Sequence, residues 1–110
     1  MTATHLLIHR YVPGAGPQPG TPEHDDEMRR WGELDARLRN EGVIAGSFAL
    51  QSRGEVITES AASPWREDGE VVFAAHAITA ADDAAATAIA RDMPTAEYGT
   101  VEVRPLMDVG

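Results

Sequence analysis

The chain has 110 residues, a length typical of a single domain with one modest hydrophobic core. Its 9 basic residues against 18 acidic ones give a formal net charge of −9, which argues against nucleic-acid binding and against attraction to anionic membranes. The absence of cysteine excludes disulfides, a thiol nucleophile and a thiolate metal site. No apolar run approaches the ~20 residues of a membrane-spanning helix and no signal peptide is recognisable, so we expect one cytoplasmic domain over residues 1–110.

The first half of the chain predicts a strand, a long loop and an amphipathic helix. Residues 4–11 alternate imperfectly between the two faces of a strand. Residues 12–22 contain four prolines and three glycines, a composition typical of a loop that is either a lid or disordered. A helix is predicted over residues 22–41, because Thr21 can cap it and Pro22 suits its first position. Its apolar stripe is predicted to comprise Met28, Trp31, Leu34 and Leu38.

The second half predicts further strands and a short second helix. Strands are expected at residues 43–51, 55–59, 70–78 and 98–107, with a loop over 61–69. A capping sequence at residues 79–82 starts a helix that continues through residue 92 and stops before Pro94.

The resulting order of elements is β-α-β-(β)-β-α-β. This order is typical of a ferredoxin-like α+β sandwich, in which an antiparallel sheet carries two helices on one face. The helix-free face would expose the apolar side chains Leu7, Tyr11, Val72 and Leu106. We therefore expect a homodimer in which a second copy of the chain covers this face.

Three stretches of the sequence resemble YCII-related proteins, and in particular their DGPF subgroup. They are the strand Leu6-Leu7-Ile8, the helix and return over residues 31–50, and the ending Ala96-Glu97-Tyr98-Gly99-Thr100-Val101-Glu102-Val103-Arg104-Pro105. The Asp-Gly-Pro-Phe stretch that names the subgroup is missing, and Asp68-Gly69-Glu70-Val71 lies near that region without the Pro-Phe. The resemblance implies a dimeric α+β barrel with a cleft on the helix-free face of the sheet.

Some relatives within this resemblance look like lyases that use a His–Asp pair, with the histidine on the first helix. Trp31 stands at the position of that histidine, and Asn40 stands at the position of the nearby acid. Because both members of the pair are absent, the resemblance does not carry this chemistry over to the chain.

The alternation of side chains along the strands gathers another polar set on the helix-free face. The side chains expected to face the helices are Leu6, Ile8, Val71, Phe73, Val101 and Val103. The helix-free face would then carry His5, His9, His76, Glu102 and Arg104. We take His9, His76 and Glu102 as candidate catalytic residues, since histidine exchanges a proton near neutral pH and a carboxylate can fix its tautomer. The candidate substrate contacts are Arg104, which could bind an anionic oxygen, Tyr11, His5 and Trp65.

Less specific interpretations of the same side chains stay open. They could be polar residues at a wet dimer interface, with Glu102 and Arg104 in a salt bridge. His9, His76 and Glu102 could also hold a metal, but no compact ligand motif supports one, and we expect neither a metal nor a cofactor. His9 lies where the strand enters the Pro/Gly-rich loop, so we expect it at the mouth of a cleft, where its substitution would hardly change stability.

Two functions are consistent with this sequence. The first is a cofactor-independent acid–base enzyme of the isomerase, cyclase or lyase type, acting on a small cyclic or aromatic carbonyl compound in a cleft at the dimer face. The alternative is a non-catalytic dimeric module that binds a small ligand or another protein. A cavity with His9 or His76 near a buried carboxylate would favour the enzyme, whereas a cleft filled by side chains would count against it.

Overall fold

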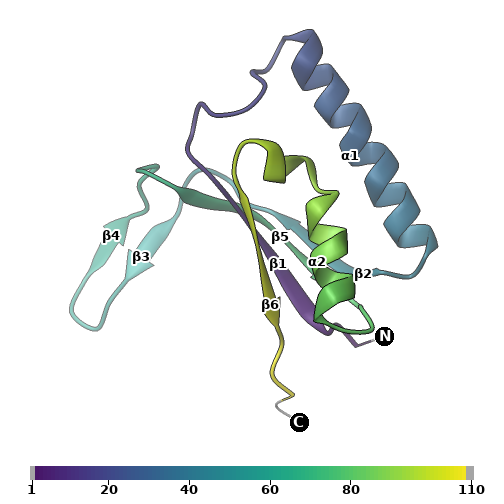
Figure 1. The fold of residues 1–110 in the computed structure, drawn as a ribbon. Helices are drawn as coiled ribbons and strands as arrows, with labels where there is room; N and C mark the ends of the chain where they lie inside the picture. Colours follow the sequence, from purple (N-terminus) through teal and green to yellow (C-terminus); the bar gives the residue numbers. More distant parts are fainter. Residues whose placement is uncertain (1, 109–110) are drawn as a thin grey trace.

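The computed structural model describes residues 2–108, which form two helices packed on an antiparallel sheet (Figure 1). The elements follow in the order β1 (His5–Tyr11), α1 (Pro22–Asn40), β2 (Ile44–Ala49), β3 (Glu55–Ile57), β4 (Ala62–Pro64), β5 (Val71–Ile78), α2 (Asp83–Arg91), the 3₁₀ helix η1 (Pro94–Glu97) and β6 (Thr100–Pro105). Each predicted helix and strand is present, while β4 lies in a segment that the sequence predicted to be a loop.

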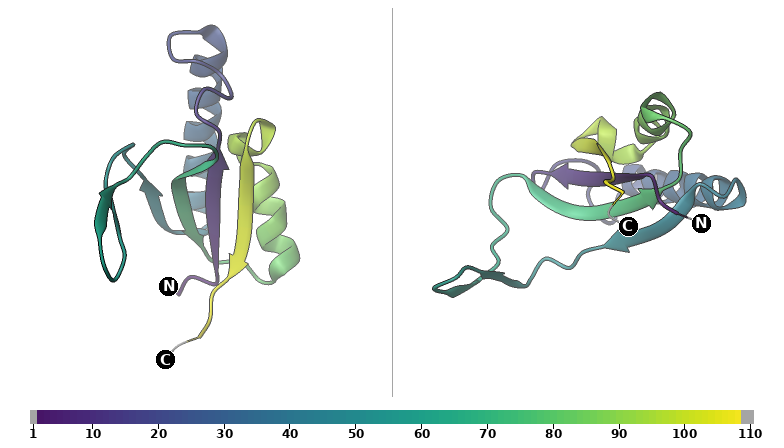
Figure 2. Two further views of the ribbon diagram at one scale, coloured as in Figure 1. Left: turned by 90° about the vertical axis from the view of Figure 1, so that its left-hand side faces the viewer. Right: turned by 90° about the horizontal axis from the view of Figure 1, so that it is seen from below.

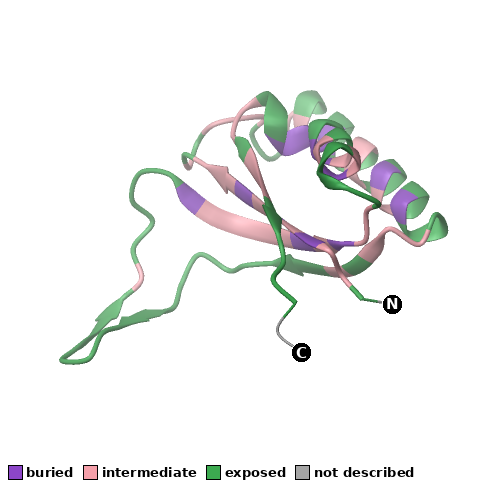
Figure 3. Cartoon of the chain, turned by 60° about the horizontal axis from the view of Figure 1, so that its bottom comes forward, coloured by how far each residue is buried: buried purple, intermediate pink, exposed green. Residues whose placement is uncertain are grey.

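Four strands form the main sheet in the order β2-β5-β1-β6, and all neighbouring pairs are antiparallel. The views in Figures 2 and 3 show both helices on one face of this sheet, while the other face is free of helices. This is the ferredoxin-like α+β fold that the order of elements predicts. Because β1 and β5 occupy the centre of the sheet, their side chains decide what the helices pack against.

Helix α1 begins as predicted, since the Thr21 hydroxyl accepts a backbone hydrogen bond three residues further on, at 3.2 Å. Its buried face differs from the predicted stripe at one end, where Met28 is 47% exposed and Glu27 only 3% exposed. Positions 27, 31, 34 and 38 are spaced by four, three and four residues, so Glu27 shares a face with the buried Leu34 and Leu38. The inward-facing row therefore begins with a carboxylate, and the prediction for Met28 is wrong.

Helix α2 is short and rich in alanine. The Asp82 carboxylate caps it by accepting a hydrogen bond from the Ala85 N–H at 2.8 Å. Ala86 and Ala90 are buried, and their small side chains allow the helix to lie close to the sheet.

No helix within residues 2–108 is long and apolar enough to cross a membrane.

The hydrophobic core lies between the sheet and the two helices. Leu7 of β1 and Ile78 of β5 are fully buried at its centre. The other buried members are Leu34, Leu38, Ala86, Ala90 and Met93. Burial of one large aliphatic side chain contributes about 1.5–3 kcal/mol, so the core decides which face of each central strand meets the helices.

The position of Leu7 in the core reverses the predicted faces of β1. His5, Leu7 and His9 are buried against the helices, whereas Leu6 and Ile8 point to the helix-free face. Three consecutive apolar residues fit either face of a strand, so alternation alone could not choose between the two arrangements. The predicted positions of all five side chains are therefore wrong.

A β-bulge in β5 explains a second difference. The pairing with β1 shifts between His9 and Arg10, which leaves Phe73 as the extra residue on β5. Val71 and Phe73 lie on the helix side as predicted, but beyond the bulge the alternation restarts and His76 is also buried there. The prediction that His76 lies on the helix-free face is therefore wrong.

Strands β3 and β4 form a separate two-stranded sheet, which extends beyond the main sheet (Figures 1 and 3). We term residues 54–65 the arm. Figure 2 shows that the arm leaves the domain on the side away from the helices. All residues of its two strands are exposed, including Ile57 at 70%. Because an isolated hairpin is at best marginally stable in water, the arm adds little to the stability of the domain.

Candidate functional site

Two buried histidines on the central strands are in contact with each other. His9 Nε2 of β1 lies 2.8 Å from His76 Nδ1 of β5. The other ring nitrogen of His9, Nδ1, lies 3.0 Å from the Thr95 hydroxyl of η1. These three side chains form a hydrogen-bonded row, Thr95–His9–His76, which we term the histidine chain.

Aromatic rings enclose the histidine chain. Trp31 of α1 stacks on His76, with ring centroids 5.9 Å apart and planes 9° apart, and the Phe73 ring lies 5.9 Å from His9. Burial, and then the neighbouring His76, lower the pKa of His9 from 6.5 to about 4. Burial also lowers the pKa of His76. Both imidazoles are therefore neutral at pH 7, and a single proton lies between the two rings.

The structure brings His9 and His76 together but separates them from Glu102. Glu102 lies on the helix-free face, where Arg10 donates a hydrogen bond to one of its oxygens and Arg104 donates to the other at 3.1 Å. The hydrogen bond from Arg10, and then that from Arg104, lower the pKa of the Glu102 carboxyl. The predicted ion pair of Glu102 with Arg104 is confirmed, and their position on this face is as predicted. A site shared by Glu102 and the histidines is wrong, because the sheet lies between them.

His5 also has a different surrounding from the predicted one. Its Nε2 lies 2.8 Å from the Asp83 carboxylate at the start of α2, and its Nδ1 lies 2.8 Å from the Thr4 hydroxyl. His5 therefore ties β1 to α2 instead of lining a cleft on the helix-free face.

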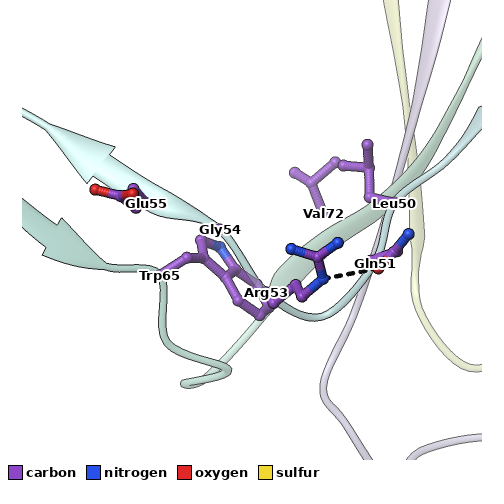
Figure 4. Close-up of a pocket in the computed structure, with 7 residues that line it drawn as sticks. All are labelled: Leu50, Gln51, Arg53, Gly54, Glu55, Trp65 and Val72. Carbon is purple, nitrogen blue, oxygen red and sulfur yellow. Dashed lines mark hydrogen bonds between the residues drawn. The ribbon is translucent and has the colours of Figure 1, made fainter.

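Trp65 lies at the root of the arm, beside a surface hollow of about 240 Å³ (Figure 4). The hollow is lined by Leu50, Gln51, Arg53, Gly54, Glu55, Trp65 and Val72. Arg53 Nε donates a hydrogen bond to the Gln51 side chain at 2.9 Å, so this guanidinium already has a partner. The hollow lies at the root of the arm, and its lining includes no member of the histidine chain.

A second pocket, of about 250 Å³, lies beneath the Pro/Gly-rich loop that joins β1 to α1, and we term it the loop pocket. Three aromatic rings line it: Tyr11, Phe73 and Tyr98. The Tyr11 ring meets Phe73 edge to face with centroids 4.7 Å apart, and it meets Tyr98 at 6.4 Å. Tyr11 therefore lies on the helix side of the sheet, and its predicted position on the helix-free face is wrong.

Glu27 gives the loop pocket a buried carboxylate. Its Oε2 atom is inaccessible to solvent and has no hydrogen-bond partner within residues 2–108. Buried polar groups are nearly always hydrogen bonded, so an unpartnered carboxylate oxygen marks a candidate site. The sequence contains the signal for it, because Glu27 precedes Trp31 by one helical turn on the buried face of α1. Sequence reasoning missed Glu27 because acidic residues at the start of a helix are usually explained by the helix dipole.

Tyr98 adjoins Glu27 in the loop pocket. Burial, and then a side-chain hydrogen bond with the Glu27 carboxylate, raise the pKa of Tyr98 above its ordinary value of 10, so the phenol keeps its proton at neutral pH. The Tyr98 backbone N–H donates to the Thr95 carbonyl at 3.1 Å, and the Thr95 hydroxyl contacts His9. The loop pocket and the histidine chain therefore meet at η1.

Within residues 2–108, no group of three or more acidic or histidine side chains is arranged to hold a metal ion. In a comparison with known protein families, the sequence profile of the YCII-related domain matches residues 3–109. The chain belongs to the YCII-related domain family. No curated protein matches this YCII-related domain in sequence.

The polar groups of this YCII-related domain lie in two separate places. The ion pairs of Glu102 with Arg10 and Arg104 lie on the helix-free face, where each carboxylate oxygen of Glu102 accepts a hydrogen bond. Beneath the Pro/Gly-rich loop, Glu27 and the protonated phenol of Tyr98 line one aromatic-walled pocket. The two side chains hydrogen bond to each other, and the Glu27 Oε2 atom has no donor within residues 2–108. The second arrangement can accept a proton at one point and donate a hydrogen bond at another, which is the minimum for acid–base chemistry.

Proposed function

We propose that this YCII-related domain is a cofactor-independent acid–base enzyme of the isomerase, cyclase or lyase type. Its substrate is a small cyclic or aromatic carbonyl compound, which binds in the loop pocket on the helix side of the sheet. The observation that carries this proposal is the buried Glu27 in the wall of the pocket, whose Oε2 atom has no hydrogen-bond partner within residues 2–108.

Glu27 is the general base in this proposal. A carboxylate oxygen that accepts no hydrogen bond is free to take a proton from an atom beside the substrate carbonyl group. The rings of Tyr11, Phe73 and Tyr98 provide apolar walls against which a ring-shaped substrate can stack. The base and the binding surface are thus parts of the same pocket.

Tyr98 is the hydrogen-bond donor to the substrate carbonyl oxygen, and its single O–H turns from the Glu27 carboxylate to the substrate for this role. When a base removes a proton beside a carbonyl group, negative charge develops on the oxygen, and a fixed donor stabilises it. The phenol of Tyr98 is protonated at neutral pH, as this role requires.

His9 and His76 act as positioning residues in this proposal. They are neutral at pH 7 and are not among the residues that line the loop pocket. Through its contact with Thr95, His9 holds η1, and η1 leads directly into Tyr98. The histidine chain therefore supports the position of Tyr98, the hydrogen-bond donor. Glu27, instead of the histidines predicted from strand alternation, is the general base.

Hydrogen exchange tests the proposal without knowledge of the natural substrate. A panel of small cyclic and aromatic carbonyl compounds is incubated with the protein in D₂O, and loss of the hydrogens beside the carbonyl is followed by proton NMR. We expect at least one compound to exchange faster than in buffer, and Glu27→Gln to lower this rate by roughly 10²–10⁴-fold, the usual contribution of a positioned acid–base group.

Two further variants sharpen the test. Glu23→Gln makes the same chemical change at an exposed position in the first turn of α1, so it should keep the full rate. Tyr98→Phe keeps the ring but removes the donor, so it should lower the rate. Exchange no faster than in buffer across the panel, or equal rates for Glu27→Gln and the unaltered protein, would rule the proposed reaction out.

A further inference from the structure

We infer that the loop pocket takes a planar carbonyl compound that also carries a positively charged nitrogen group, such as an amidinium or a protonated nitrogen heterocycle. The inference rests on the proposed function, because it names the substrate class of the same site. Three observations carry it: the sign of the charge in the pocket, the arrangement of its aromatic rings and its small volume.

The charge of the loop pocket is negative. Glu27 is buried in its wall, and among the described residues that line it the basic side chains are limited to His24. Arg30 is close enough to be influenced by the Glu27 charge, but its guanidinium is hydrogen bonded to Glu97. The Arg30 Nε lies 3.2 Å from the Asp26 carboxylate and has no hydrogen-bond partner within residues 2–108. A cation is therefore the natural partner for Glu27, whereas an anion would be repelled across a poorly solvated space.

The aromatic rings add to the attraction for a cation. A cation within about 6 Å of the face of an aromatic ring is stabilised by the electrons of that ring. Tyr11 stands at 65° to Phe73 and at 76° to Tyr98, so the rings present walls in different directions around one space. A flat cationic group can stack on one wall and point its N–H bonds at Glu27.

The volume restricts the size of the compound. About 250 Å³ lies just below the roughly 300–1,000 Å³ of most ligand pockets, so a single ring with small substituents fits. Gly16 of the Pro/Gly-rich loop packs so closely on Tyr98 that an added Cβ would lie 2.8 Å from the ring atoms. The loop therefore sets one boundary of the space.

Pairing with Glu27 also defines the proton that moves. A C–H bond beside the carbonyl group of the bound compound breaks, its proton goes to the Glu27 carboxylate, and the electron pair moves onto the carbonyl oxygen, which forms an enolate. The Glu27 carboxylic acid then returns the proton to a different carbon or to the oxygen of the ligand, which forms the tautomer and restores the carboxylate. The step is an isomerisation that needs no oxidant, reductant or second substrate.

Three probes of nearly equal shape test the ligand class: benzamidinium, benzamide and benzoate. Each is titrated into the protein at pH 7 by isothermal calorimetry. We expect benzamidinium to bind at least about tenfold more tightly than benzamide, because charge-assisted hydrogen bonds are roughly twice as strong as neutral ones. We expect benzoate to show no binding. Glu27→Gln should remove the preference for benzamidinium, while Glu23→Gln should keep it.

Amide NMR shows where the probe binds. Binding in the loop pocket should move the signals of Gly16 and Tyr98, whereas binding in the hollow at the arm would move that of Gly54. Shifts at Gly54 alone would overturn the inference, as would equal affinity for benzamidinium and benzamide or a preference that survives Glu27→Gln.

The two experiments separate failure of the ligand class from failure of the reaction. Glu27-dependent exchange of neutral carbonyl compounds, without a preference for benzamidinium, would overturn the ligand class and leave the reaction standing. A Glu27-dependent preference for benzamidinium, without exchange of any compound, would support the ligand class and overturn the reaction.

Discussion

His9 is fully buried, and each of its ring nitrogens lies within hydrogen-bond distance of a partner. In the unfolded chain the same ring is in water, where its pKa is about 6.5. The folded protein lowers that pKa to about 4, so between these values the unfolded chain binds more protons than the folded one. Because proton binding and folding are linked, the contribution of His9 to stability is fully present above its pKa in the unfolded chain. This contribution is lost as the pH falls toward the pKa of His9 in the folded protein.

We therefore predict that the free energy of unfolding decreases between pH 7 and pH 4.5. The shift from 6.5 to about 4 corresponds to at most about 3 kcal/mol for His9, and the lowered pKa of His76 adds to the decrease. Urea unfolding at several pH values measures it. His9→Gln lacks the titrating group, so its stability should depend less on pH across this range.

Leu7→Ala provides the control for this pH dependence. It removes a fully buried side chain next to His9 in sequence and should lower stability by about 2–5 kcal/mol without removing a titrating group. Its unfolding free energy should keep the pH dependence of the unaltered protein. Equal pH dependence in His9→Gln and Leu7→Ala would mean that His9 titrates normally in the folded state.

Whether the orientation of a side chain could be predicted from the sequence depended on its immediate neighbours. Val101 and Val103 alternate with polar neighbours, so the sequence fixes their side of β6, and both pack against the core as predicted. The run Leu6-Leu7-Ile8 has no such alternation, and only the packing of Leu7 under the helices selects its orientation. The face of Glu27 could be predicted from helical spacing, but its missing partner is a property of the folded pocket.

The Pro/Gly-rich loop is an element with its own internal hydrogen bonds. The Gln18 side chain donates to the carbonyl groups of Gly14 and Gly16 at 2.7 and 2.9 Å. Both glycines have positive φ, at +94° and +81°, a conformation that other residues rarely adopt. The two positions differ in their surroundings, because only Gly16 packs against Tyr98, while Gly14 has open space around it.

This difference gives a matched pair of substitutions. Gly14→Ala should lower the free energy of unfolding by about 1 kcal/mol through backbone strain alone. Gly16→Ala has the same strain and also forces its Cβ into the Tyr98 ring, which adds about 1–3 kcal/mol. Gly16→Ala should in addition weaken benzamidinium binding, since Tyr98 must move. Equal losses of stability and affinity in the two variants would show that the loop does not shape the pocket.

The two helices were predictable because their signals are local. Each helix has a capping residue, Thr21 or Asp82, and a 3.6-residue periodicity along its own length. Both signals lie within short stretches of sequence. The bulge at Phe73 carries no such signal, because a bulge depends on the pairing of two strands that lie far apart in the chain. The loop pocket depends on the same pairing, since Phe73 is one of its walls.

Over the whole molecule, the helix-free face of the sheet is largely apolar. Leu6 and Ile8 point to it from β1, and Phe48 of β2 lies there beside Ala75, with 57% of its surface exposed. The ion pairs of Glu102 interrupt this apolar surface. Exposed apolar surfaces of this kind are typical of interaction sites, and an antiparallel sheet with one bare apolar face can pack on a copy of itself.

We propose that a second copy of the chain covers the helix-free face. Light scattering at micromolar concentration should then give twice the 11.8 kDa of one chain. Phe48→Glu introduces a charge on this face and should produce monomers, whereas Met107→Glu makes a similar change at an 80% exposed site beyond β6 and should not. A mass of 11.8 kDa for the unaltered protein would exclude the dimer, and a dimeric Phe48→Glu would exclude this interface.

The monomeric Phe48→Glu variant also tests the location of the site. The loop pocket lies on the helix side of the sheet, while Phe48 lies on the opposite face. Benzamidinium should therefore bind the monomer as tightly as the dimer, and the calorimetric titration compares the two directly. A site built across the two helix-free faces would instead be destroyed by dissociation of the dimer. A loss of benzamidinium binding in the folded monomer would therefore show that the site lies at the dimer interface.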